Sequence, residues 1–201
     1  MNGLYKLTDW IMKLAYINIL WLFFSLLGIF IFGLFPATIA MFNVMRDLIN
    51  KKEGYSVFSS FWNTYKKELV KGNIVGYVLT LIVIVLYLEL VFIVSYNNNL
   101  LNLFFVPLLI LTFIIYSAFL YVVPLYINYD NKIFQHLKNA FLVLLTNPFI
   151  TLAMVIGCIV IYFINTTFPV IILFFSGSII SYIIVKFSSY AFQKIELNKV
   201  N

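Results

Sequence analysis

Five long stretches of this sequence are almost free of charged residues, and they decide what the chain can fold into. Four carry no charge, and the stretch over 74–96 carries one, Glu89. About 20 consecutive apolar residues cross a bilayer as a helix. A soluble domain averages roughly 45–50% apolar residues, whereas this chain has 64%. The sequence therefore predicts an all-α, polytopic membrane protein, with one integral membrane domain over 1–201. The stretches cover 14–35, 74–96, 100–127, 140–164 and 167–185.

A shorter apolar segment over 37–50 decides between five and six spans. It follows Pro36, which suits the first turn of a new helix, and its helix would be about 21 Å long. If this segment crosses, all 13 Lys and Arg residues face the cytoplasm and both termini lie inside. If it does not, Lys6 and Lys13 lie outside. Because the Lys and Arg bias sets orientation, we prefer six spans. These are 14–35, 37–50, 74–96, 100–127, 140–164 and 167–187.

The polar connection between the second and third spans predicts a cytoplasmic amphipathic helix over 56–71. Its aromatic and aliphatic side chains recur at helical spacing, Ser56 is a plausible N-cap, and its lysines lie mostly on the other face. Such a helix lies at a membrane interface or against its own bundle, or it docks in the groove of a partner. The candidate docking residues are Phe58, Phe61, Trp62, Tyr65, Lys66 and Leu69.

Glu89 is the charged residue that lies deep within a predicted span. An intramembrane carboxylate is a functional hypothesis by default, and it would serve proton or cation coupling or a contact with another subunit. No other span offers an intramembrane charged partner or histidine, so a relay lacks its second member. The favoured interpretation is a protonated or hydrogen-bonded side chain packed inside the bundle. Small residues such as those at Gly72 and Gly76 are assigned to close helix packing.

The scarcity of chemically reactive residues argues against an enzyme. The chain has one histidine and one cysteine, too few for a zinc site of the usual His and Cys ligands. We expect His136 to be solvated in a polar loop and Cys158 to behave as a small apolar residue. The net charge of +6 follows from the positive-inside rule and does not require a nucleic-acid partner. No catalytic residue, cofactor or metal ligand is predicted.

Four stretches of the chain resemble the YesL-like family of small bacterial multi-span proteins, built on a domain of unknown function. The most specific stretch is the turn that contains Gly33, Pro36, Ala37, Thr38 and Ala40. The other three stretches are the segment 18–21 (Asn-Ile-Leu-Trp), the aromatic residues of the amphipathic helix with Tyr65-Lys66, and Lys138-Asn139-Ala140 with Asn147-Pro148.

The resemblance implies a role but no reaction. Members are often encoded beside carbohydrate ABC importers, which implies a non-enzymatic accessory subunit in the bacterial plasma membrane. Its partners would be membrane lipid, the sugar permease and the proteins associated with it, with a homo-oligomer as a further option. The chain lacks the cytoplasmic Glu-Ala-Ala loop by which importer permeases hold their ATPase, which argues against its being the permease. The alternative function is a stand-alone small secondary transporter or channel that uses Glu89.

Overall fold

The computed structural model describes residues 2–50, 56–95 and 99–200, and all regular elements within these ranges are α-helices. Four of the described helices are long and apolar enough to cross a membrane, over Tyr5–Leu27, Lys71–Ser95, Phe104–Asn128 and Pro148–Thr167. This confirms an all-helical chain with membrane-spanning helices. The helices are α1 (Asn2–Leu27), α2 (Leu34–Ile49), α3 (Val57–Glu68), α4 (Lys71–Ser95), α5 (Asn99–Asn128), α6 (Ile133–Thr146), α7 (Pro148–Thr167), α8 (Pro169–Phe174) and α9 (Ser176–Val200).

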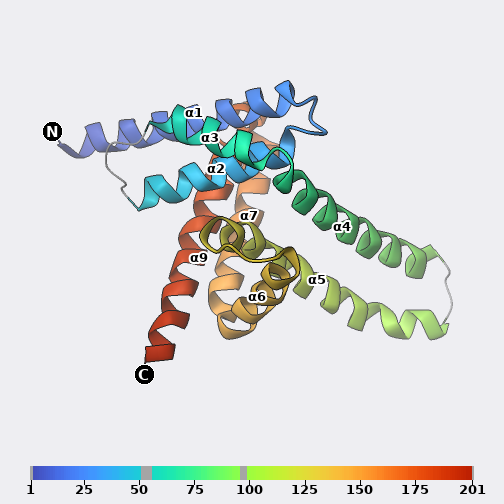
Figure 1. Ribbon diagram of the computed structural model, residues 1–201. Helices are drawn as coiled ribbons and strands as arrows, with labels where there is room; N and C mark the ends of the chain where they lie inside the picture. The colour runs from blue at the N-terminus through green and yellow to red at the C-terminus, as the bar shows by residue number, and fades with distance from the viewer. Residues whose placement is uncertain (1, 51–55, 96–98, 201) are drawn as a thin grey trace.

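α2 lies at the centre of the fold, and it is the short helix that the sequence predicts over 37–50. It contacts α1, α3, α4, α5 and α9, and Figure 1 shows α1, α2 and α3 packed together at one end of the molecule, above α7 and α9. Ala37, Ala40 and Val44 are completely buried. Their spacing places them on one helical face, and because they are small, neighbouring helices approach α2 closely.

The predicted first span over 14–35 is interrupted. α1 ends at Leu27, and a tight turn over 28–33 leads into α2, with Pro36 in the first helical turn as predicted. A Cβ atom added to Gly28 would lie 2.3 Å from the backbone of Gly33, so the turn closes only because both residues are glycines. Ile29 and Phe30 between them adopt φ values of 54° and 55°, a left-handed conformation that ends a helix.

Two further predicted spans are also divided, and prolines begin the new helices. The predicted span over 140–164 starts within α6, stops at Asn147, and continues as α7 from Pro148. The predicted span over 167–187 contains α8, which starts at Pro169, and the first half of α9, with Phe175 between them. Proline has no N–H to donate and its φ suits the first turn of a helix. Pro148 therefore explains the division of the first run, whereas the second run divides at Phe175, where no proline lies.

The predicted spans over 74–96 and 100–127 correspond to α4 and α5, which form a hairpin that extends away from the rest of the bundle (Figure 1). At the root of the hairpin, α4 presses against α2. A Cβ atom on Gly72 would lie 2.9 Å from Ile39 Cδ1, and one on Gly76 would lie 2.0 Å from the Phe35 ring. These glycines have the packing role predicted for them.

Candidate functional site

The aromatic face of α3 packs against its own bundle, one of the alternatives that the sequence leaves open. Phe24 of α1 is the centre of the contact, with ring centroids 5.3 Å from Phe61 and 4.9 Å from Tyr65. The Tyr65 hydroxyl donates a hydrogen bond of 3.2 Å to the Phe24 carbonyl, and burial raises the Tyr65 pKa. Phe61 and Tyr65 are both buried. The assignment of these two side chains to a partner-docking surface is therefore wrong for the folded chain.

The other docking candidates remain on the outside of α3 or just after it. Phe58, Trp62 and Leu69 are partly exposed. The Lys66 ammonium lies 4.9 Å from the centroid of the Trp62 ring, a cation–π contact at an exposed site. Their role in docking stays a prediction.

The residues of the family turn hold α1 and α2 together. Gly33, Pro36, Ala37 and Ala40 are buried. The Trp21 indole donates a hydrogen bond of 3.0 Å to the Thr38 hydroxyl, which in turn donates one of 2.7 Å to the Leu34 carbonyl. The specificity of this stretch thus has a packing explanation.

Asn18, the first residue of the other family stretch in α1, joins α1 to the break between α8 and α9. It is completely buried. Its amide nitrogen donates a hydrogen bond of 2.7 Å to the Leu173 carbonyl, and its amide oxygen accepts one of 3.1 Å from the backbone N–H of Ser178. Both are backbone groups at a helix end, where no partner within the helix is available.

Glu89 lies in the C-terminal half of α4, where it is half-buried. The ion pairs recorded between described residues are Lys13–Asp9 and Arg46–Asp47, so Glu89 belongs to neither. Among the apolar residues near it on the helix, Val85 and Phe92 are exposed, whereas Leu86 and Ile93 are buried. The far ends of α4 and α5 extend away from the other described helices (Figure 1).

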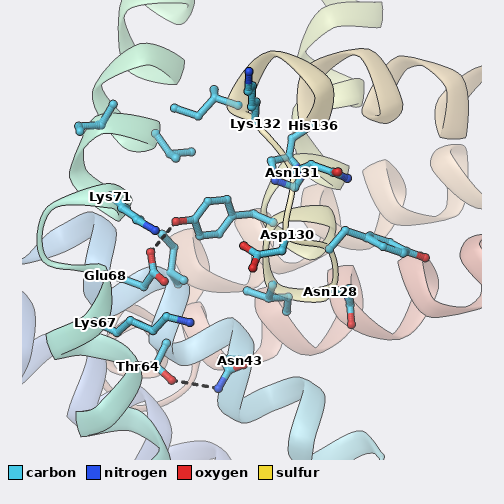
Figure 2. A pocket seen from close by; sticks show the side chains of 17 residues that line it. Asn43, Thr64, Lys67, Glu68, Lys71, Asn128, Asp130, Asn131, Lys132 and His136 are labelled. Carbon is cyan, nitrogen blue, oxygen red and sulfur yellow. Dashed lines mark hydrogen bonds between the residues drawn. The ribbon is translucent and has the colours of Figure 1, made fainter.

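A polar concavity lies at the opposite end of this hairpin. We call it the root pocket. It is a cavity of about 840 Å³ formed by α2, the ends of α3 and α5, the start of α4, the loop over 129–132 and the start of α6 (Figure 2). Its ionisable lining residues are Lys67, Glu68, Lys71, Tyr126, Tyr129, Asp130, Lys132 and His136.

Hydrogen bonds between helices fix the walls of the root pocket. The Tyr126 hydroxyl of α5 donates a hydrogen bond of 2.5 Å to the buried Glu68 carboxylate of α3. The Asn43 amide of α2 donates one of 3.0 Å to the Thr64 hydroxyl of α3; both bonds are drawn in Figure 2. Arg46 supports this arrangement from behind, because its guanidinium donates to the Asn43 side chain and to the Ile127 carbonyl.

His136 is the most unusual residue of this wall. The prediction of a solvated loop histidine is wrong, because His136 lies in the first turn of α6 and is 1% exposed. Neither ring nitrogen has a hydrogen-bond partner of normal geometry among the described residues, and the Tyr126 ring lies edge-on at 5.5 Å. Burial lowers the His136 pKa, opposed by the backbone of Asn131 and the charge of Asp130.

The three lysines of the root pocket have no ion pair among the described residues. Lys67 and Lys71 come from the end of α3 and the start of α4, and Lys132 precedes α6. In Figure 2 the Lys67 ammonium and the Asp130 carboxylate point toward the same space from opposite sides. Sequence reasoning missed this pocket because its residues come from three separate stretches of the chain, 39–43, 64–75 and 126–136, each with an ordinary surface composition.

Comparison with known proteins places the chain in a family. The family model described as "Protein of unknown function, DUF624" matches residues 14–90. The chain is 36% identical to the uncharacterized protein YesL of Bacillus subtilis (strain 168), over 97% of this chain and 92% of YesL. It is 37% identical to YteU of the same organism, over 88% of this chain and 79% of YteU, and 31% identical to YesV, over 97% and 94%. The chain belongs to this family. No solved structure matches it.

Membership in the YesL-like family confirms the predicted resemblance and leaves the activity open. The matched region runs from α1 to the C-terminal half of α4, so it includes the family turn, α3 and the Lys67, Glu68 and Lys71 side of the root pocket. The other side of the pocket, with Lys132 and His136, lies beyond this region but within the stretch shared with YesL and YesV, which covers nearly the whole chain.

Proposed function

We propose that this protein is a non-enzymatic accessory subunit of a carbohydrate ABC importer in the bacterial plasma membrane. The family resemblance supports the link to sugar import. The observation that carries the subunit role is the position of Glu89, half-buried on a hairpin that extends beyond the rest of the bundle.

A carboxyl group at this place favours an association with another membrane protein. Charged side chains in membrane spans almost always face a bundle interior or a water-filled cavity, because lipid cannot hydrogen-bond to them. Two helices alone cannot enclose such a group. A helix of a partner subunit packed along α4 and α5 would complete the enclosure, and the exposed apolar side chains around Glu89 would supply its contact area.

The proposal includes six spans with both termini in the cytoplasm. α2 and α9 would be the two spans added to the four long apolar helices. This topology keeps all 13 Lys and Arg residues on the cytoplasmic side.

The alternative is an independent secondary transporter or channel that uses the same carboxyl group. Its support is also the half-buried state of Glu89, since a coupling residue must be reached by protons or ions. The two functions differ in what accompanies the protein. A subunit is isolated with its importer, whereas an independent carrier works alone.

The test is purification of the tagged protein from its own membrane in mild detergent, followed by mass spectrometry. We expect a sugar permease and its associated proteins in near-equal amounts. Glu89→Leu should release them, and Asp9→Asn, a carboxyl change at an exposed site in α1, should not. Recovery of the protein alone would contradict the proposal. Proton or sugar flux in liposomes that disappears in Glu89→Gln would then establish the alternative.

A further inference from the structure

We propose that the root pocket is a binding site for a phosphate group, presented either by an anionic lipid of the adjacent leaflet or by a soluble phosphate ester. The site involves neither Glu89 nor the far end of the hairpin. The inference therefore stands apart from the role of the protein as an importer subunit, and it can be tested on the purified protein alone.

The level of the pocket in the membrane fits a lipid headgroup. α4 begins at Lys71 and α5 ends at Asn128, and both residues line the pocket. These are the polar ends of two helices long and apolar enough to span a bilayer. Ile39, Ile74 and Val75 line the same cavity, so a ligand with a polar head and an apolar remainder finds matching surfaces.

The charge of the lining favours an anion. Three lysines face two carboxylates, Glu68 and Asp130, which leaves an excess of one positive charge. The Glu68 carboxylate already accepts the short hydrogen bond from Tyr126, and Asp130 is exposed at the rim. Lysine binds phosphate as a compact point charge. Basic pockets between membrane helices on the cytoplasmic side bind phosphate-bearing lipid headgroups.

His136 supplies an independent observation that points to a ligand. Buried polar atoms almost always have a hydrogen-bond partner, and an exception needs an explanation. His136 is 1% exposed and lines the pocket, and neither ring nitrogen makes a hydrogen bond of normal geometry among the described residues, although the Asn131 backbone is close enough to favour the protonated ring. A neutral imidazole carries one N–H donor, and rotation of the buried ring toward the cavity would bring this donor to a phosphate oxygen. The cavity volume of about 840 Å³ is within the usual range for small-molecule sites.

The experiment measures ligand retention by native mass spectrometry of the detergent-purified protein. The probes are phosphatidylglycerol, the phosphate-free lipid diacylglycerol, and inorganic phosphate as a competitor. We expect one phosphatidylglycerol to be retained and diacylglycerol to be lost. Lys67→Gln/Lys71→Gln should weaken retention about tenfold or more. The matched control Lys66→Gln/Lys138→Gln changes two exposed lysines outside the pocket lining and should retain the lipid as the unmodified protein does.

Each outcome decides a part of the inference. Retention of phosphatidylglycerol that inorganic phosphate displaces identifies a lipid ligand, and binding of inorganic phosphate without lipid retention identifies a soluble ester. The proposal would be overturned if the pocket variant still bound both phosphatidylglycerol and inorganic phosphate, or if the control variant lost them equally. It would also be overturned if the unmodified protein bound neither probe. His136→Leu gives a second readout. It should lower retention while the ligand-free melting temperature does not fall, and unchanged retention would remove His136 from the site.

Discussion

The centre of the bundle and the α4–α5 hairpin both contain many large apolar side chains, but these have opposite surroundings. Around α2, side chains such as Ala37, Ala40 and Phe61 are completely buried by other helices of the same chain. Along α4, Leu81 is 63% exposed and Leu88 is 57% exposed. Hydropathy measures the preference to leave water, and it does not state what replaces the water. Protein fills that place in the centre, and lipid or a partner subunit must fill it at the hairpin.

The two regions also treat polar groups differently. In the centre, the side chains of Asn18, Thr38 and Tyr65 each bond to a backbone carbonyl of the same chain. These carbonyls lie in the last turn of α1, the first turn of α2 and the last turn of α8. In contrast to these three side chains, the polar side chain of Glu89 on the hairpin is not enclosed by the fold. Substitutions in the centre should therefore affect folding, and substitutions at the hairpin should affect association.

The largest expected effect comes from removing a buried ring in the centre. Phe61→Ala should lower the free energy of unfolding by about 3–5 kcal/mol, because it leaves a cavity beside Phe24 that the helices cannot close. Phe113→Ala is the matched change on the hairpin, where the ring is 52% exposed, and it should cost less than about 1 kcal/mol. Denaturant unfolding in detergent micelles measures both, and equal losses would contradict the distinction between the two regions.

A smaller effect is expected from removing the polar bridge of the centre. Asn18→Leu keeps the side-chain volume but leaves the Leu173 carbonyl and the Ser178 N–H without their partner. Each unsatisfied buried group costs about 1–3 kcal/mol, so the two together should cost roughly 2–6 kcal/mol. Asn63→Leu on the exposed side of α3 is the control and should change stability by less than about 0.5 kcal/mol. A loss in Asn18→Leu no larger than in the control would show that the bridge does not support the break between α8 and α9.

Predictions from the sequence succeeded where one local pattern determines the structure. Apolar runs predict α4 and α5 nearly to the residue, and the proline at 36 and the helical stripe after Ser56 predict α2 and α3. The interruptions at 28–33, Asn147 and Phe175 lie inside runs that carry no charged residue. An apolar run predicts burial in the membrane and does not determine that one helix continues through it.

The outcomes at α3 and in the root pocket depended on contacts distant in sequence. The stripe of α3 predicts an apolar face, but only the position of Phe24 in α1 shows that its own bundle covers Phe61 and Tyr65. His136 follows a polar segment and therefore resembles a loop residue. It is buried because Tyr126 of α5 packs against it. No pattern within the segment itself contains that information.

The smallest expected effect is a pH dependence of stability from His136. Its pKa is lowered in the folded chain from the unfolded value near 6.5, so the unfolded chain binds more protons as the pH falls through that value. Stability is therefore full above pH 6.5 and decreases on acidification until the folded-state pKa is passed. Tyr126, Asp130 and Lys132 are the ionisable groups nearby.

A comparison with His136→Leu isolates this contribution, because the other titrating groups remain in both proteins. Melting temperatures in detergent between pH 7.5 and 5 should fall more steeply for the unmodified protein than for the variant. Bound phosphatidylglycerol should reduce the difference, since a phosphate beside the ring favours the protonated imidazole and raises its pKa. Parallel pH profiles for the two proteins without lipid would show that the burial of His136 is not linked to protonation. The exposed lysines of the root pocket, and not a titrating histidine, would then be what distinguishes it from the centre of the bundle.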